Sequence, residues 1–227
     1  MATTDTVKVW DLFVRAGHWA LVALFAIAYL TGEEGGWLHN WAGYAIAALV
    51  VARVIWGFVG PEHARFRDFA FGPARVAGYA RRLLTGRARR YVGHSPAGGT
   101  MAILLLVMLA LTTGTGMIQY AHEEGGGPLA PFLAGSPPAV GAEAEREYYE
   151  DEEEGEHGER ESVFRGEAGE DRESAVAEAH EVFANLTLAL IVVHILGVLY
   201  SSWAHHENLV RAMFTGRKRA EPRAGGD

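Results

Sequence analysis

Four long apolar runs alternate with polar stretches along the chain, at residues 14–32, 37–60, 97–121 and 180–204. Each has 19–25 residues, which is enough to cross a hydrocarbon core of about 30 Å as a helix. Lipid offers the backbone no hydrogen-bond partner, so helices are the expected form. The alternative, four buried helices of a soluble bundle, is disfavoured because the third run has almost no polar outward face. The pattern predicts an all-α fold, an integral membrane four-helix bundle.

Charge predicts how this bundle is oriented. Arginines crowd the segment 61–96 and basic residues return after residue 204, whereas the short segment 33–36 is acidic. Loops rich in Lys and Arg stay on the cytoplasmic side of a membrane. We therefore expect both termini and the loop 61–96 in the cytoplasm, and residues 33–36 and 122–179 outside. This predicts a multi-pass protein of the bacterial inner (plasma) membrane.

The segment 122–179 differs sharply from the rest of the chain. It carries 18 of the 28 acidic residues and only 4 of the 20 basic ones. Such a composition favours a largely disordered external loop, although its end, from about Glu170, could extend the fourth helix. It separates residues 1–121, with three spans, from residues 180–227, with the fourth span and a basic tail. The loop is either a solvated connection or a docking surface for a cationic partner.

The chain has no cysteine. Disulfides, iron–sulfur clusters, zinc–thiolate sites and covalently attached haem are therefore excluded. Any metal or cofactor must be held by His, Met, carboxylate or backbone groups.

Two histidines bracket the fourth apolar run. His180 and His194 are 14 residues apart, which in a helix is about 21 Å along the axis and about 40° short of four full turns. The two rings therefore share one helix face at opposite membrane depths. Ionisable residues inside a span are costly, so each is a candidate for function.

The other spans offer a partner at each depth. His18 lies near the start of the first run, on the expected cytoplasmic side, and His39 lies near the start of the second run, on the outer side. This predicts two pairs, His18 with His194 and His39 with His180. Two neutral imidazoles at one depth suit the axial positions of a b-type haem, whereas zinc prefers about four clustered ligands. The sequence thus predicts two haem b groups, with these four histidines as axial ligands of the iron.

Other polar residues near the spans have weaker assignments. His94 and His122 flank the third run and could substitute as ligands. Arg53 lies 14 residues after His39, on the same face. It either extends to the membrane surface or pairs with a propionate of the inner haem.

Four stretches carry a resemblance to a known family: "VWDLFVRAGHW", "HNWAGYAIAALVVARVIWGFVGPEHARF", "GHSPAGGTM" and "HILGVLYSSWAHHENLVRAMFTGRK". With them the chain resembles the bacterial four-helix di-haem cytochrome b family. That family includes prokaryotic cytochrome b-561 and the membrane subunits of nickel–iron hydrogenases and formate dehydrogenases. The family's axial ligands fall on the first, second and fourth helices, which matches the four histidines above. The acidic loop departs from the family's pattern.

The resemblance implies electron transfer across the membrane between the quinone pool and an external redox partner, with quinone oxidoreductase activity. In related subunits the quinone lies near the inner haem and the start of the third helix. For this chain that implies ubiquinone or menaquinone near His94, Ser95 and Gly98, although "SPAGG" is also an ordinary helix entry. The external partner would be a c-type cytochrome or a hydrogenase-like subunit; no nucleic acid is expected. Alternatives are an anchor for such a complex, a superoxide:quinone oxidoreductase, and a metal-ion transporter.

Overall fold

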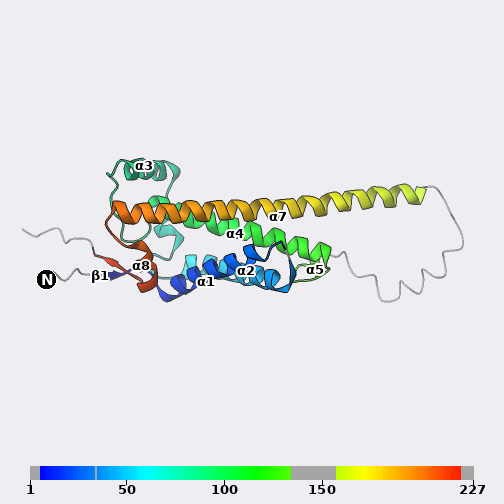
Figure 1. The fold of residues 1–227 in the computed structure, drawn as a ribbon, viewed down its shortest axis with the longest axis horizontal. Coiled ribbons are helices and arrows are strands. Elements are labelled where there is room, and N and C mark those ends of the chain that lie inside the picture. Colours follow the sequence, from blue (N-terminus) through cyan, green and yellow to red (C-terminus); the bar gives the residue numbers. More distant parts are fainter. Residues whose placement is uncertain (1–5, 34, 134–156, 221–227) are drawn as a thin grey trace, which may run out of the picture. The chain divides into compact units, whose positions relative to one another are not determined.

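The fold is described from a computed structural model, which describes residues 6–33, 35–133 and 157–220 (Figure 1). Two short strands, β1 (Thr6–Lys8) and β2 (Arg217–Arg219), stand at the two ends of the chain. Between them lie α1 (Leu12–Leu30), α2 (Gly36–Val59), a single 3-10 turn η1 (Phe66–Asp68), α3 (Pro73–Leu84), α4 (Pro96–Glu123), α5 (Ala130–Leu133), α7 (His157–Ala204) and α8 (Leu209–Thr215). The protein is thus almost wholly helical, as predicted.

Four helices are long and apolar enough to span a membrane: α1, α2, α4 and residues Ala175–Ala204 of α7. They coincide with the four apolar runs to within a few residues, which confirms the predicted four-helix membrane protein. Their boundaries follow local signals. The Asp11 carboxylate accepts a hydrogen bond from the Val14 amide at 3.0 Å and begins α1, because the first amides of a helix lack partners within it.

Two compact units make up the chain, one of residues 1–110 and 184–227 and the other of residues 111–183. In the first unit, α1 and α2 pack around Ile46 and Val50, which contact Leu109 of α4. The Tyr29 hydroxyl of α1 donates to the Asn185 side chain of α7 at 3.0 Å. These contacts connect all four spanning helices within this unit.

A polar cap closes one end of the spans in this unit. β1 and β2 pair antiparallel, with Val7 opposite Lys218. Beneath them a second apolar cluster joins Val9, Trp10 and Val14 to Ala64. The cap is defined here as β1, β2, α3, α8 and the segments that join them to the spans. It lies at the arginine-rich end of the spans, the predicted cytoplasmic side.

Buried ion pairs connect strand β2 to the rest of this cap. Glu207 lies 3.1 Å from an Arg90 nitrogen and 3.8 Å from the Lys218 ammonium. The Lys218 ammonium also donates to the Tyr91 carbonyl at 2.9 Å. The side chains of Glu207 and Lys218 are only 8% and 6% exposed, so this contact is part of the interior.

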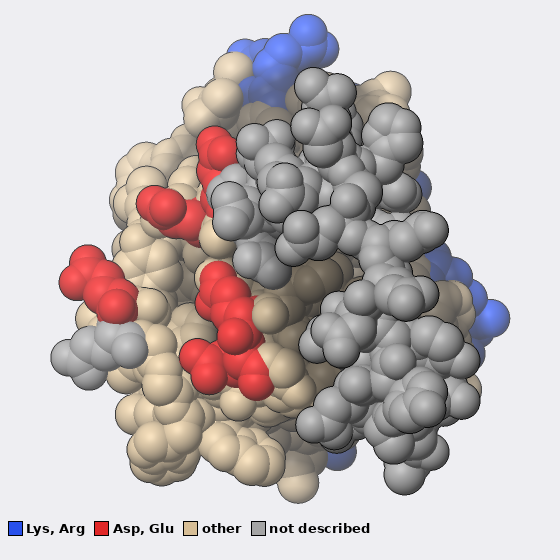
Figure 2. Space-filling view, turned by 90° about the vertical axis from the view of Figure 1, so that its right-hand side faces the viewer, with Lys and Arg blue, Asp and Glu red and all other residues tan. Residues whose placement is uncertain are grey.

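The second unit contains the end of α4, the short helix α5 and the beginning of α7. α7 begins at His157, well before the extension expected from about Glu170. Residues 134–156 of the acidic loop lie outside the described residues, so the prediction of disorder there stays a prediction. Figure 2 shows one face of the molecule, where acidic side chains are seen at the centre and on the left and Lys and Arg only at the margins.

Candidate haem site

The structure brings together the predicted pair His18 and His194. Their ring centroids are 6.4 Å apart, with planes inclined by 55°. A metal bound between two imidazoles at about 2 Å from each nitrogen separates the ring centres by about 6 Å. The spacing therefore leaves room for one metal ion between the rings. Two axial imidazoles are what a six-coordinate haem takes from its protein.

Three buried polar atoms on the first two spanning helices lack hydrogen-bond partners among the described residues. The Nδ1 of His18, the indole nitrogen of Trp19 and one terminal nitrogen of Arg53 are buried without a hydrogen bond there. Buried polar groups normally have partners. The Trp19 ring lies 5.1 Å from the His18 ring, so its indole nitrogen is an unsatisfied donor beside the ligand pair, and such a donor fits a polar group of a bound cofactor, such as a haem propionate.

Glycines near the ligands leave open space. A Cβ added at Gly43, one turn after His39, or at Gly197, three residues after His194, would meet no atom within 4 Å apart from its chain neighbours and the backbone of its own helix. Gly17, beside His18, is equally open. A flat macrocycle needs such close access to a helix backbone. The open backbone at Gly17 and Gly197 therefore fits a haem beside His18 and His194, and Gly43 leaves the same space beside His39.

Arg53 lies among aromatic rings. Its guanidinium carbon is 5.4 Å from the centre of the Phe66 ring and 5.8 Å from that of Phe69, distances at which cation–π attraction operates. These rings hold the guanidinium without neutralising it, since Arg53 has no ion pair among the described residues. The prediction that Arg53 faces a carboxylate of the cofactor stays a prediction, and the unsatisfied nitrogen is compatible with it.

His94 is clamped between two aromatic rings just before α4. Its ring centre lies 4.6 Å from Trp10 and 4.3 Å from Phe69. Burial lowers the pKa of His94 to about 3, and the positive charge of Arg53 contributes further. The ring is therefore neutral at physiological pH. Its Nδ1 is buried without a hydrogen-bond partner in the described part of the chain, so this histidine is able to bind a polar ligand.

Ser95 and Gly98 serve the start of α4. The Ser95 hydroxyl accepts a hydrogen bond from the Gly98 amide at 3.2 Å, and its carbonyl accepts from Gly99 at 2.8 Å. This is the geometry of a helix N-cap. The contacts of these two residues are thus those of an ordinary helix entry, and of the three predicted quinone-lining residues only His94 shows an unsatisfied polar atom.

His39 is positioned by the preceding helix. Its Nδ1 donates to the Ala28 carbonyl oxygen at 2.8 Å. Ala28 is in the last turn of α1, where carbonyls have no partner within the helix. The bond selects the tautomer whose Nε2 carries the lone pair, the nitrogen that a metal would take.

His180 has the corresponding arrangement in the second unit. Its Nδ1 donates to the Thr112 carbonyl oxygen at 2.9 Å, and the Thr115 hydroxyl lies 3.3 Å from the same nitrogen. Gly116 gives the ring its space, because a Cβ there would lie 2.8 Å from the His180 Cε1. His39 and His180 belong to different units, so their pairing stays a prediction.

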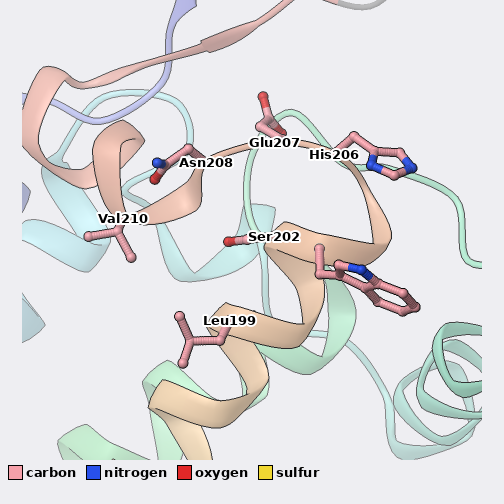
Figure 3. Close-up of a pocket in the computed structure, with 7 residues that line it drawn as sticks. Leu199, Ser202, His206, Glu207, Asn208 and Val210 are labelled. Atoms are coloured by element: carbon pink, nitrogen blue, oxygen red, sulfur yellow. The ribbon is translucent and has the colours of Figure 1, made fainter.

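Three further histidines, His122, His205 and His206, have contacts of another kind. His122 is exposed at the end of α4. The Tyr79 hydroxyl and the His205 Nε2 are 3.4 Å apart. His206 borders a shallow pocket formed by the end of α7, the turn after it and the start of α8 (Figure 3). The pocket is lined by Leu199, Ser202, Trp203, His206, Glu207, Asn208 and Val210, none of which is a predicted haem ligand.

Among the residues that the structure describes, no three His, Asp or Glu side chains converge as a metal-ion site would require. The candidate ligands of a cofactor are therefore histidines on the apolar spans, taken in pairs. A family model, described as prokaryotic cytochrome b561, matches residues 9–216.

The chain belongs to the prokaryotic cytochrome b561 family.

Comparison with curated proteins and with solved structures gives no match. Membership of the family, with four apolar helices, makes the chain a membrane b-type cytochrome of electron transfer. Binding of b-type haem is a property of this family, and we infer it for the chain from its membership.

Several groups that shape the site were missed in the sequence. The carbonyls of Ala28 and Thr112 carry no side-chain signal, because any residue supplies one. Gly116 is part of the third apolar run, but its contact with His180 follows only from the packing of α4 against α7 within the second unit. Trp10 and Phe69, which enclose His94, come from segments outside the spans.

Proposed function

We propose that this cytochrome moves electrons across the bacterial inner membrane between a quinone in the bilayer and a redox partner outside, such as a c-type cytochrome or a hydrogenase-like subunit. Two haem b groups would serve, one between His18 and His194 and one between His39 and His180. The observation that carries the proposal is the 6.4 Å separation of the His18 and His194 rings. Haem b supplies reversible one-electron chemistry when it is bound.

The chain's own residues bind and orient the cofactor. The histidines present neutral imidazole nitrogens, which avoids placing charge in lipid. Arg53 offers a positive charge to a propionate. The apolar spans exclude water, so the potential is governed by ligands, burial and nearby charge.

The quinone would bind beside His94, near the start of α4. Reducing a quinone to a quinol consumes two electrons and two protons, so the site needs a polar contact to the quinone oxygen. The His94 ring supplies one, because it is neutral and its Nδ1 is unsatisfied among the described residues. Ser95 and Gly98 would contribute through the backbone of the helix entry.

A reduced-minus-oxidised visible spectrum and a haem-to-protein ratio of the purified chain test the proposal. We expect b-type bands and two haems per chain. A colourless protein after haem-replete expression would refute it.

Single substitutions test the ligands. His39→Ala and His180→Ala should each lose one of the two haems, while His94→Ala should keep both and impair reaction with quinol. Retention of two haems by the first two variants would refute the ligand assignment.

A further inference from the structure

Helix α3 lies beside the end of the fourth spanning helix, within the first unit. The Tyr200 hydroxyl of α7 donates to the Leu83 carbonyl oxygen, in the last turn of α3, at 3.2 Å. The Tyr79 hydroxyl, from the middle of α3, lies 3.4 Å from the His205 Nε2, just after α7. The apolar span of α7 ends at Ala204. These two contacts therefore fix α3 at the membrane boundary on the side of the cap.

The surface of α3 has two apolar sides. One side holds the buried Tyr79, whose ring centre lies 5.7 Å from that of Tyr91. The other side carries Ala77 and Leu84, which are seven residues apart and therefore lie on one line of the helix. Both are exposed, and Leu84 is 76% exposed. An exposed apolar line on a basic helix is typical of a helix that lies in the membrane interface.

Exposed arginines cover the rest of α3 and the turn that follows it. Arg81 and Arg82 are in the last turn of the helix. The turn at Gly86, where φ is +68°, brings the chain back, so that the Arg87 amide donates to the Arg82 carbonyl oxygen at 2.8 Å. Glycine adopts this left-handed conformation without strain. The arginine patch is defined here as the exposed side chains of Arg75, Arg81, Arg82, Arg87 and Arg89.

No carboxylate of the described residues neutralises the arginine patch. The sequence has no acidic residue between Asp68 and Glu123, and none of the five arginines forms an ion pair in the described part of the chain. Arg90, the next residue in the chain, differs because it pairs with Glu207 in the interior. Unpaired positive charge at a membrane boundary is complementary to anionic lipid headgroups, and a guanidinium group binds phosphate through two parallel hydrogen bonds.

An exposed tryptophan adjoins α3. Trp203 is 71% exposed, and its ring centre lies 5.8 Å from that of Tyr200, which is hydrogen-bonded to α3. Trp and Tyr favour the headgroup level of a bilayer. On α7, Trp203 also borders the shallow pocket that contains Leu199 and Val210 (Figure 3). Apolar side chains and unpaired arginines therefore occur together at this boundary, as a molecule with a charged head and apolar chains requires.

We propose that α3 and the turn after it bind the headgroup of an anionic phospholipid, in the leaflet that meets the cap. The arginine patch contacts the phosphate, while Leu84 and Trp203 lie at the level of the lipid chains. The lipid holds α3 against the end of α7 and so stabilises the cap. This binding does not depend on haem or on the assignment of its ligands.

Thermal unfolding in lipid nanodiscs tests the proposal. The protein is compared in phosphatidylcholine alone and in phosphatidylcholine mixed with phosphatidylglycerol. We expect a higher unfolding temperature with phosphatidylglycerol, and a smaller gain when salt screens the charges. Equal unfolding temperatures in the two lipids would overturn the proposal.

Two matched double variants locate the effect. Arg81→Gln with Arg82→Gln removes two charges from the arginine patch, and Arg67→Gln with Arg211→Gln removes two exposed charges elsewhere in the cap. After extraction into detergent, mass spectrometry should find phosphatidylglycerol enriched over phosphatidylcholine in the unaltered protein and in the second variant. The first variant should lose this enrichment. Equal enrichment in the two variants would overturn the proposal.

Leu84→Gln provides a second test that keeps every arginine. Leu84 is exposed, so this substitution should leave the fold intact in detergent. It should reduce the gain in unfolding temperature that phosphatidylglycerol gives, because a polar side chain is less favourable at the level of the lipid chains. An unchanged gain would contradict the placement of α3 in the leaflet and overturn the proposal.

Inorganic phosphate distinguishes a lipid headgroup from a free anion. Phosphate added to the protein in phosphatidylcholine nanodiscs should leave the unfolding temperature equal to that in chloride of the same ionic strength. A rise as large as the rise given by phosphatidylglycerol would mean that the arginine patch takes a free anion, which would overturn the proposal.

Discussion

The spans and the cap treat polar groups in opposite ways. In the cap, Glu207, Arg90 and Lys218 satisfy one another and the backbone in the interior. On the spans, one nitrogen of His18 and one of Arg53 are buried without a hydrogen-bond partner among the described residues. A complete network is typical of a structural role, and an incomplete one is typical of a place where a ligand belongs. The comparison therefore separates the polar groups that stabilise the fold from the polar groups that are available to a bound cofactor.

The largest expected effect comes from breaking the cap network. Glu207→Gln removes the carboxylate between Arg90 and Lys218 and leaves two buried cations facing each other. Removing one partner of a buried ion pair costs about 3–5 kcal/mol. We expect a large fall in the thermal unfolding temperature and early cleavage by trypsin in the cap. Adding Lys218→Met should recover part of the loss, and exposed Glu62→Gln should change nothing.

A second effect tests how tightly the cap packs on α4. Gly99 faces the Phe69 carbonyl oxygen so closely that an added Cβ would collide with it. Gly99→Ala should destabilise the protein by about 1–3 kcal/mol, the usual range for overpacking. Gly78→Ala in α3, where a Cβ meets no atom of another residue within 4 Å, should be neutral or stabilising. Equal unfolding temperatures for the two variants would contradict this packing.

Acid should weaken the protein through His94. Burial lowers its pKa from 6.5 to about 3. Between these two values the unfolded chain binds a proton at His94 and the folded chain does not. Stability is therefore complete above pH 6.5 and falls as the pH drops towards 3, by about 1.4 kcal/mol per pH unit at most. Arg53, Lys218, His63 and His194 are the neighbouring groups that oppose protonation.

The control for this titration is His94→Gln, which has no proton to gain. Unfolding temperatures measured from pH 7 to pH 4 should fall less steeply in this variant than in the unaltered protein. Equal slopes would assign the acid sensitivity to other groups.

The smallest effect is expected on the exposed face of α3. Arg81→Gln removes a charge from an exposed side chain that has no ion pair among the described residues. Such surface changes usually stay within about 0.5 kcal/mol. A larger loss of stability would mean that this face of α3 contacts something the isolated chain does not show.

The sequence was informative where a single side chain carries the signal. Apolar length predicted the four spans, and the spacing of His180 and His194 led to the pairing of His194 with His18. Sequence patterns do not predict which backbone carbonyl accepts a hydrogen bond from a ligand side chain. The carbonyls of Ala28 and Thr112 look like any others, and the burial of Lys218 is unexpected in a strongly basic tail.

The quinone prediction shows a different limit. Ser95 and Gly98 were singled out by their position before the third span, and their contacts cap α4. A capping motif and a ligand loop share Ser, Pro and Gly, because both need exposed backbone amides. His94 differs from them through Trp10 and Phe69, which are distant in sequence.

Strand β1 precedes the first spanning helix and strand β2 follows the fourth, so β1 has no partner until all four spans have been synthesised. Their pairing requires both strands to lie on the same side of the bilayer. An uneven number of crossings would keep Thr6–Lys8 and Arg217–Arg219 on opposite sides. The two-stranded sheet can therefore form only when an even number of spans has been inserted into the membrane.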